Sequence, residues 1–251
     1  MEHVNVDILV CIDDTDNLES RGTGKLAAIL CDALEKNGWG MCQAITRHQM
    51  LVHPDIPYTS HNSAMCFAAE IGQKFLHPFT EYAQSFLVRE SAPGSDPGLC
   101  IVRLDRLDDP EALIEFGRKT KTDVLTKEEA YRLAAHLNIH LSEHGGTGQG
   151  VIGAIAGCGL RLSGNDGRFR GHFYIDADRL RVDELIRQTG CNVVMGLDGD
   201  ILTDDEPVLI GEKVKAVLKD DKAILFVFAQ PDEQTGEISW RTCTKEQLRC
   251  F

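Results

Sequence analysis

Short apolar runs alternate with helical patterns along the chain. The run from Val6 to Ile12 ends in a polar turn, which is typical of a buried strand. From Lys25 to Asn37 the apolar residues recur on one helical face, and Gly38 follows as a stop signal. We therefore predict that the chain begins as strand, loop and helix.

The same patterns predict six more elements up to residue 137. They are strands over Met41 to Val52, Ala64 to Ile71 and Leu99 to Leu104, and helices over Thr80 to Glu90, Pro110 to Lys119 and Thr126 to Leu137. A capping-box sequence, Thr126-Lys127-Glu128-Glu129, introduces the last helix. Strands and helices are thus expected to mix in this part of the chain.

From Phe169 onward, β-branched runs surround a single helical pattern near Val182 to Gln188. The runs are Cys191 to Met195, Pro207 to Ile210, Lys213 to Val217, Ala223 to Phe228 and Ile238 to Cys243. The whole pattern predicts an α/β (α+β) fold with a mixed-sheet lobe over residues 1–105 and an α+β lobe over residues 106–251. The two lobes could also pack as one unit.

Composition and charge narrow the choice of partners. Hydrophobic residues make up 43% of the 251 residues and charged residues 26%, so we expect a folded protein. The formal net charge of −13, and the absence of any run of five Lys or Arg residues, disfavour non-specific attraction to a nucleic acid backbone. A small substrate or a protein partner is the expected ligand.

The cysteines and the amino terminus indicate the compartment. The nine cysteines form no Cys-x-x-Cys pair, and most lie in apolar runs, so they are expected to be reduced core residues. The segment from Met1 to Asp7 lacks a basic region followed by an apolar stretch, and no apolar run approaches eighteen residues. We expect a cytoplasmic protein without a membrane segment.

An acidic turn follows the first predicted strand. Asp13, Asp14 and Asp16 stand within four residues, where we expect the carboxyl edge of a sheet. Mg²⁺ prefers carboxylate and phosphate oxygens, and crowded like charges are costly unless a cation or a shared proton neutralises them. The alternative is a surface turn in which Thr15 and Asp16 act as local caps.

The loop after this turn leads directly into a helix. Its backbone N–H groups would point toward the carboxylates, and phosphate could lie between them. The segment Gly22-Thr23-Gly24-Lys25 superficially resembles a Walker loop, but Glu19 stands in place of its first glycine and Leu26 follows the lysine. It is not a phosphate-binding loop by pattern, and its glycines could equally be turn residues.

A second glycine-rich segment runs from His144 to Gly153. It contains Gly148-Gln149-Gly150-Val151-Ile152-Gly153, but we expect a helix before it, so as a dinucleotide fingerprint it is weak. The glycines indicate close approach of the backbone, either to an anion or to another chain segment. A helix beginning near Gly150 would offer its amino end to a phosphate.

Two further clusters could bind metal. His136, His140 and His144 recur every four residues, and on one continuous helix they would form a zinc face. Asn138 and Ile139 favour an earlier end to the helix, which leaves solvated or capping histidines. The segment Asp204-Asp205-Glu206 is expected to be an exposed acidic loop, with assistance to a metal as the alternative.

Three segments resemble, in order, the motifs of the 2-agmatinylcytidine synthetases that modify a minor isoleucine tRNA. They are Ile12 to Asp16 with Arg21-Gly22, Pro54 to Ala64, and Gly148 to Ala156. The resemblance implies a kinase-like domain followed by a ferredoxin-like domain, and use of ATP to activate the wobble cytidine before agmatine is attached. The family's oligonucleotide-binding barrel and zinc ribbon have no counterpart here, so we expect RNA only if a partner subunit presents it.

The resemblance also implies roles for individual residues. Asp13, Asp14 and Asp16 would bind Mg²⁺ and orient ATP, and Thr23 is the nearby candidate for a phosphate-accepting threonine, although its segment departs from the family's pattern. Either Arg21 or Lys25 could add a positive contact. The expected nucleotide-binding residues are Thr15, Arg21, Gly22, Thr23, Gly24, Lys25, Asn62, Ser63, Gly148 and Gly150.

Three functions are compatible with these patterns. The first is a Mg²⁺-dependent, ATP-binding enzyme that activates an acceptor by phosphoryl transfer or hydrolyses nucleotide. The second is a non-catalytic regulatory or partner-binding module with the same fold. The third is a phosphatase of the haloacid dehalogenase type, because Asp14-Thr15-Asp16-Asn17 has its Asp-x-Asp start, with Lys213 and Asp204-Asp205 as partners in reversed order.

Overall fold

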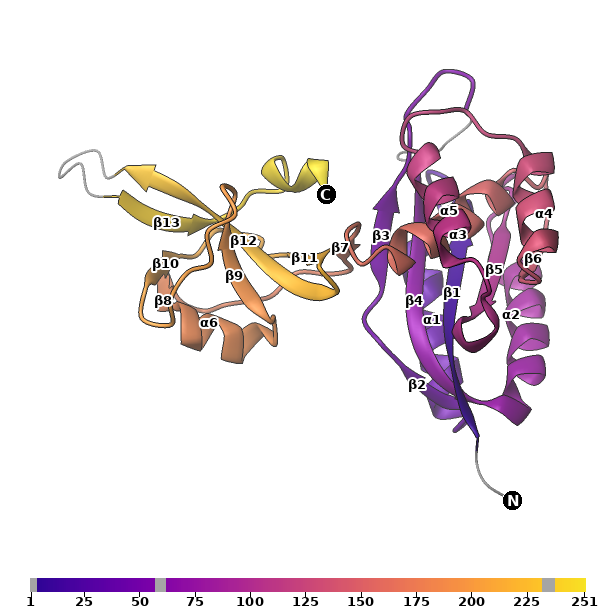
Figure 1. The fold of residues 1–251 in the computed structure, drawn as a ribbon, viewed down its shortest axis with the longest axis horizontal. Coiled ribbons are helices and arrows are strands. Elements are labelled where there is room, and N and C mark those ends of the chain that lie inside the picture. Colours follow the sequence, from indigo (N-terminus) through magenta and orange to yellow (C-terminus); the bar gives the residue numbers. More distant parts are fainter. Residues whose placement is uncertain (1–3, 57–61, 232–237) are drawn as a thin grey trace. The chain divides into compact units, whose positions relative to one another are not determined.

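The computed structural model describes residues 4–56, 62–231 and 238–251, and it divides into two compact units (Figure 1). The units are Met1–Ser163 and Gly164–Phe251. The division lies well beyond the boundary predicted near Asp105. Helices α3 (Pro110–Lys119), α4 (Lys127–His136) and α5 (Gly150–Leu162) belong to the first unit, because their apolar faces are buried in the same core as strands β1 and β5.

The first unit is built on an antiparallel sheet with β1 (Asn5–Asp13) inside it. The strand order is β6 (His140–Glu143), β5 (Gly98–Arg103), β1, β4 (Ser63–Gly72) and β3 (Thr46–Gln49), and β2 (Gly40–Cys42) also pairs with β4. The strand predicted over Met41 to Val52 is therefore two strands, β2 and β3. The acidic turn follows the carboxyl end of β1, and because β1 runs antiparallel to both neighbours, the ends of β4 and β5 beside it are amino ends.

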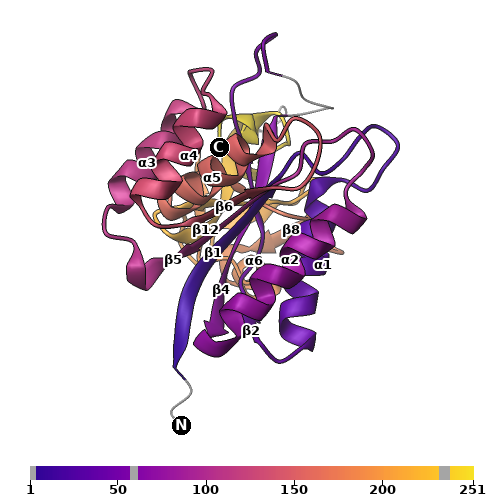
Figure 2. The ribbon, with the colours of Figure 1, turned by 90° about the vertical axis from the view of Figure 1, so that its right-hand side faces the viewer.

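Helices cover both faces of this sheet (Figure 2). On one face α1 (Thr23–Lys36) and α2 (Leu76–Glu90), preceded by a 3-10 turn over Gln73–Phe75, pack against the even-numbered residues of β1, from Val6 to Ile12. On the other face α5 packs against β1, where Leu9 and Cys11 are buried, and α3 and α4 pack against α5 in the same cluster. Both faces of β1 are buried, which explains its nearly continuous apolar run.

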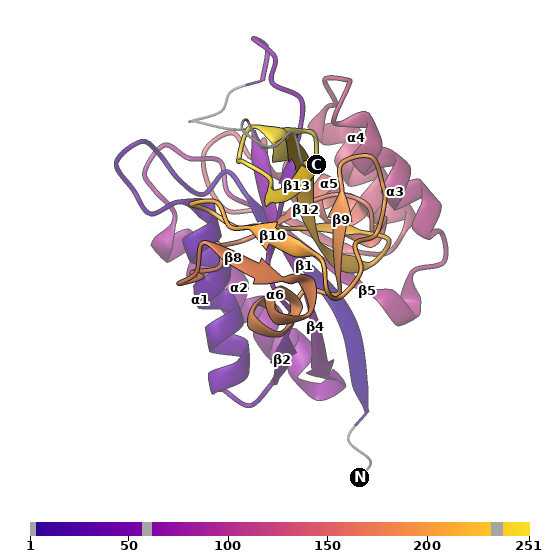
Figure 3. The same ribbon diagram turned by 90° about the vertical axis from the view of Figure 1, so that its left-hand side faces the viewer.

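The second unit contains one α-helix among its described residues, α6 (Val182–Thr189), beside short strands (Figure 3). The strand order is β7 (Arg168–Phe169), β11 (Ala216–Lys219), β12 (Lys222–Pro231), β13 (Ile238–Thr242), β10 (Pro207–Leu209) and β8 (Arg179–Arg181), and β9 (Val193–Gly196) pairs in parallel with β12. Two 3-10 turns, Leu104–Arg106 in the first unit and Gln247–Cys250 in the second, complete the chain. The predicted mixture of helices and strands in both parts of the chain is confirmed.

One prediction about residues 136–148 is wrong, and another is confirmed. The glycine-rich segment follows strand β6 and not a helix. The helix ends early, as Asn138 and Ile139 indicated: His136 ends α4, Asn138 has a φ of 52°, and His140 begins β6, so the three histidines do not align on one helix. A left-handed residue ends the helix here, because continued helix requires negative φ. No helix in the described parts of the chain is long and apolar enough to cross a membrane.

Candidate functional site

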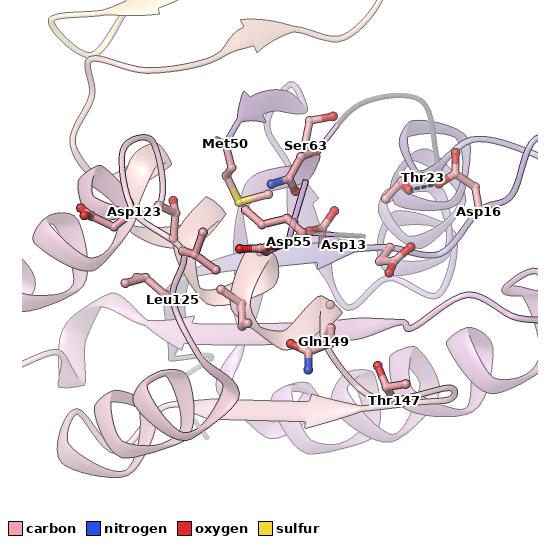
Figure 4. A pocket seen from close by; sticks show the side chains of 18 residues that line it. Asp13, Asp16, Thr23, Met50, Asp55, Ser63, Asp123, Leu125, Thr147 and Gln149 are labelled. Atoms are coloured by element: carbon pink, nitrogen blue, oxygen red, sulfur yellow. Dashed lines mark hydrogen bonds between the residues drawn. The ribbon is translucent and has the colours of Figure 1, made fainter. Parts of the chain in front are cut away.

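A cavity of about 370 Å³ opens in the first unit beside the acidic turn. Four chain segments line it: the acidic turn with the start of α1, the described residues before and after 57–61, the connection after α3, and the start of α5 with the residues just before it. Figure 4 shows Asp16 and Thr23 on one side, Asp13 and Ser63 near the centre, and Asp123 with Leu125 on the other side. The lining residues are Asp13, Asp14, Asp16, Thr23, Met50, Asp55, Ile56, Asn62, Ser63, Thr120, Asp123, Val124, Leu125, Thr147, Gln149, Gly150, Ile152 and Gly153.

The end of β1 places two carboxyl groups in low-dielectric surroundings. Asp13 is only 8% exposed, and Asp14 adopts a left-handed backbone with φ of 49°. Burial raises the pKa of Asp13 to about 8, and the charges of Asp14 and Asp16 add to the effect. Burial, with the charges of Asp96 and Asp16, raises the pKa of Asp14 to about 6. These carboxyl groups cannot all be ionised cheaply unless a cation neutralises them.

The donors around the cavity suit a hard cation. Five aspartates line it (Asp13, Asp14, Asp16, Asp55 and Asp123), and no Lys or Arg does so within the described ranges. Carboxylate oxygens are the ligands that Mg²⁺ prefers. Asp13, Asp14 and Asp16 stand closest in sequence, and burial is the main cause of the raised pKa values of Asp13 and Asp14, with the charge of Asp16 adding to both. The chemistry of these donors therefore suits a divalent cation, which would have to draw the Asp13, Asp14 and Asp16 oxygens together, because they do not all lie within 4.8 Å of one another.

The start of α1 is tied to the acidic turn by two hydroxyl groups. The buried Thr15 hydroxyl donates to Thr23 Oγ1 over 3.1 Å, and the Thr23 hydroxyl donates to Asp16 Oδ1 over 3.2 Å. No side chain caps the first turn of this helix. Thr23 therefore orients the Asp16 carboxylate while its own side chain lies on the cavity wall.

Hydrogen bonds fix the glycine-rich segment to Asp96, in the loop before β5, and to Lys127 of α4. Asp96 accepts from both the backbone N–H and the hydroxyl of Thr147, and its own carbonyl accepts from Gly150 N over 3.1 Å. Lys127 Nζ donates to Glu143 Oε2 at 2.7 Å and to Thr147 O at 2.8 Å. These contacts hold Thr147 and the first residues of α5 at the cavity.

Glycines allow α5 to approach the acidic turn closely. A Cβ at Gly150 would lie 2.1 Å from Asp96 O, and a Cβ at Gly153 would lie 1.7 Å from Asp13 Oδ2. Gly148 has a φ of +75°, which side chains disfavour. At all three glycines a side chain would collide with another segment of the chain, which confirms the interpretation of close approach between segments. The amino end of α5 also faces the cavity.

Seven of the residues expected from sequence lie around this one cavity: Asp13, Asp14, Asp16, Thr23, Asn62, Ser63 and Gly150. Thr15 is buried behind Thr23, and Gly22, Gly24 and Gly148 do not line the cavity. Neither candidate for a positive contact lines the cavity: Arg21 pairs with Glu90 at 2.6 Å, and Lys25 is exposed. Residues 57–61 of the motif Pro54 to Ala64 lie outside the described residues.

Sequence reasoning missed much of the opposite wall. It did not identify Asp55, Asp123 or Gln149, nor the apolar lining made by Met50, Ile56, Val124, Leu125 and Ile152. Asp55 and Gln149 stood within the quoted motifs, so their polarity could have marked them. Asp123 carried no such signal, because it follows α3 far along the chain and joins the same cavity only in the folded structure.

Comparison with known proteins identifies a relative of this chain. No family model matches the chain. The 2-agmatinylcytidine synthetase TiaS of Methanosarcina acetivorans, named for an isoleucine tRNA, is 28% identical over 161 residues, which cover 62% of this chain and 36% of that protein. The chain is thus related to the family whose motifs it resembles, and spans a little over one third of this relative's length.

Solved structures of that kind share the fold. A complex of TiaS with an isoleucine tRNA and ATP matches with a TM-score of 0.54 at 19% identity, over 80% of this chain and 50% of that chain. A tRNA fluorescent labeling enzyme matches with a TM-score of 0.53 at 22% identity, over 71% of this chain and 42% of that chain. At these identities the matches show a common fold.

Proposed function

We propose that this chain is a magnesium-dependent, ATP-binding enzyme that activates an acceptor by phosphoryl transfer or hydrolyses nucleotide. The observation that carries the proposal is the crowding of Asp13, Asp14 and Asp16 at one cavity without a lining cation. The relationship to a 2-agmatinylcytidine synthetase, and the fold shared with a protein crystallised with an isoleucine tRNA and ATP, support a nucleotide as the ligand.

Asp13, Asp14 and Asp16 would hold the metal, and a bound Mg²⁺ would neutralise charge on a transferring phosphoryl group. The chain's own groups supply the rest of the site. The amino end of α5, near Gly150, faces the cavity. Its N–H groups at Gly150, Val151 and Ile152 already donate within the chain, so it would favour a phosphate through the positive end of the helix dipole. Arg47 Nε donates to Ser63 Oγ over 2.9 Å, which leaves the Ser63 hydroxyl proton able to point into the cavity.

The far side of the cavity suits a nucleoside. Ile56, Val124, Leu125 and Ile152 provide an apolar wall, and flat aromatic bases bury well against such side chains. Asn62 is oriented by a hydrogen bond from its Nδ2 to Leu51 O at 2.7 Å. We expect the triphosphate at the acidic turn and the base toward Leu125. The acceptor is unidentified, and RNA enters this proposal only when a partner presents it.

Calorimetry with Mg²⁺ and a non-hydrolysable ATP analogue tests the proposal. Wild type should bind only when the metal is present, and Asp14→Asn should weaken binding by about tenfold or more, because a charged metal ligand becomes a neutral amide. Asp32→Asn is the matched control, since Asp32 is exposed on α1 and pairs with Lys36 at 3.4 Å. Failure of the wild type to bind nucleotide with Mg²⁺ would refute the proposal.

The two alternative functions, a non-catalytic module and a phosphatase, would require different observations. A non-catalytic module would bind the analogue as above yet show no turnover of ATP, alone or with any acceptor. A phosphatase of the haloacid dehalogenase type would need Lys213 and Asp204-Asp205 beside Asp14. These residues belong to the second compact unit, and the Asp205 and Glu206 carboxylates accept hydrogen bonds from Thr203. No observation favours the phosphatase.

A further inference from the structure

Three thiols converge in the core of the first unit. Cys11 of β1, Cys66 of β4 and Cys158 of α5 place their sulfur atoms within 4.8 Å of one another. All three residues are fully buried, and each comes from a different element. In the described residues these are the only three His, Cys, Asp or Glu side chains that meet so closely.

Backbone register and a glycine bring the thiols together. Cys11 and Cys66 stand directly opposite each other in the antiparallel pair of β1 and β4, so their side chains lie on the same face of the sheet. Gly157 lets α5 descend onto that face, because a Cβ there would lie 2.4 Å from Cys11 Sγ and 3.0 Å from Ala64 Cβ. Cys158 follows this contact immediately and reaches the same cluster.

The spacing fits one metal ion. Metal–sulfur bonds of about 2.3 Å, as zinc makes, place three sulfur atoms roughly 4 Å apart around a single ion. Thiolate ligands select soft ions, chiefly Cu(I) and zinc. A three-ligand zinc site keeps water or substrate in its fourth position, and a structural zinc site needs a fourth protein donor. The cluster is fully buried, so it has no opening to solvent. A fourth thiol, that of Cys100, contacts Cys158 but does not belong to the group whose sulfur atoms all lie within 4.8 Å of one another, so this group supplies three donors.

The surroundings of Cys66 favour a bound cation. Burial raises the pKa of all three thiols, and at Cys11 and Cys158 the pKa lies well above its ordinary value. At Cys66 the hydrogen bonds from the other two thiols and nearby positive charge outweigh burial, so the pKa of this thiol lies well below its ordinary value. A thiolate is the form that binds metal. The guanidinium of Arg161 would also offset part of the negative charge that remains when three thiolates bind a monovalent ion.

We propose that Cys11, Cys66 and Cys158 form a three-coordinate site for Cu(I). Binding transfers no electron, and the thiols that become ligands release their protons to solvent. The ion joins β1, β4 and α5 behind the acidic turn, since Cys11 precedes Asp13 by two residues on the same face of β1. This inference does not rest on the proposed function, and the two can fail separately.

Copper loading of the reduced, full-length chain under anaerobic conditions tests the site. Because the thiols are buried, Cu(I) should be offered both to the folded protein and during refolding. We expect about one Cu(I) per chain to remain after competition with the chelator bicinchoninate, a thiolate-to-copper charge-transfer absorption, and a Tm several degrees higher. X-ray absorption of the wild type should show a coordination shell of sulfur alone.

Variants assign the ligands. Cys66→Ala and Cys158→Ser should each lose the bound copper and the gain in Tm, whereas Cys191→Ala, at a buried cysteine of the second unit, should keep both. The sulfur-only shell of the wild type remains decisive if a variant fails to fold. The proposal is overturned by absence of copper in both loading arms, by nitrogen or oxygen in the shell, by retention of copper in Cys66→Ala, or by zinc displacing Cu(I).

Discussion

Asp13 combines burial with like-charged neighbours, and its protonation should control the stability of the metal-free protein. Its pKa is raised from an ordinary 3.8 to about 8, so between these pH values the folded state binds more protons than the unfolded state. Stability must therefore fall as pH rises across this window. Ionisation of Asp14 adds a similar loss of folding stability, but only up to about pH 6.

In EDTA, thermal unfolding should show the Tm falling from pH 6 to pH 8, and Asp13→Asn should remove most of that slope. Excess Mg²⁺ should restore the wild-type Tm at pH 8, because the ion stabilises the ionised form. Asp32→Asn serves as the control and should behave as wild type. A slope unchanged in Asp13→Asn would show that another group titrates.

Thr23 acts on the site through Asp16. Thr23→Val removes the acceptor of the buried Thr15 hydroxyl and the donor to Asp16, so it should destabilise the fold by about 1–3 kcal/mol. Affinity for Mg²⁺ with the ATP analogue should fall as well. Thr23→Ser keeps the hydroxyl and should retain both properties, as measured by urea unfolding and calorimetry. Equal losses in Thr23→Ser would point to packing of the methyl group instead.

At the scale of elements, α5 determines how closely the glycine-rich segment approaches the acidic turn. Gly153→Ala places a methyl group against Asp13 Oδ2, so the carboxylate must move. We expect binding of the Mg²⁺–nucleotide analogue to weaken by about tenfold or more. Gly22→Ala is the matched control, because its Cβ would make ordinary contact, 3.6 Å from Asp16 Oδ2. If Gly153→Ala binds the analogue as tightly as wild type, the close approach of α5 to Asp13 is not needed for nucleotide binding.

Most elements could be predicted from the sequence because their periodicity reflects burial. Strand β1 is buried on both faces, and α3 begins after the cap Asp109, whose side chain accepts from Ala112 N. Strand β6 could not be predicted, because it has only four residues and none of them is buried. The acidic turn was found because its three charges are local. Asp96, whose charge acts on Asp14, and Asp123 on the far wall of the cavity were not found, because only folding brings them to the site.

At the scale of the whole molecule, the entire cavity belongs to one compact unit. All its lining residues lie between Asp13 and Gly153, and the two apolar clusters that flank β1 are complete by Leu162. A chain truncated after Ser163 should therefore fold cooperatively and bind the Mg²⁺–nucleotide analogue with unchanged affinity. Circular dichroism and calorimetry test this, with the full chain as reference. A truncated chain that is unfolded would show that residues 164–251 are required for folding.

We expect a divalent ion to join the carboxylates of the acidic turn to a nucleotide. A crystal structure of the wild type with Mg²⁺ and a non-hydrolysable ATP analogue tests this most directly. The ion should lie about 2.0–2.1 Å from carboxylate oxygens of Asp13, Asp14 and Asp16 and from phosphate oxygens, and the base should lie against the apolar wall near Leu125. Nucleotide bound elsewhere, with these carboxyl groups carrying no ion, would contradict it.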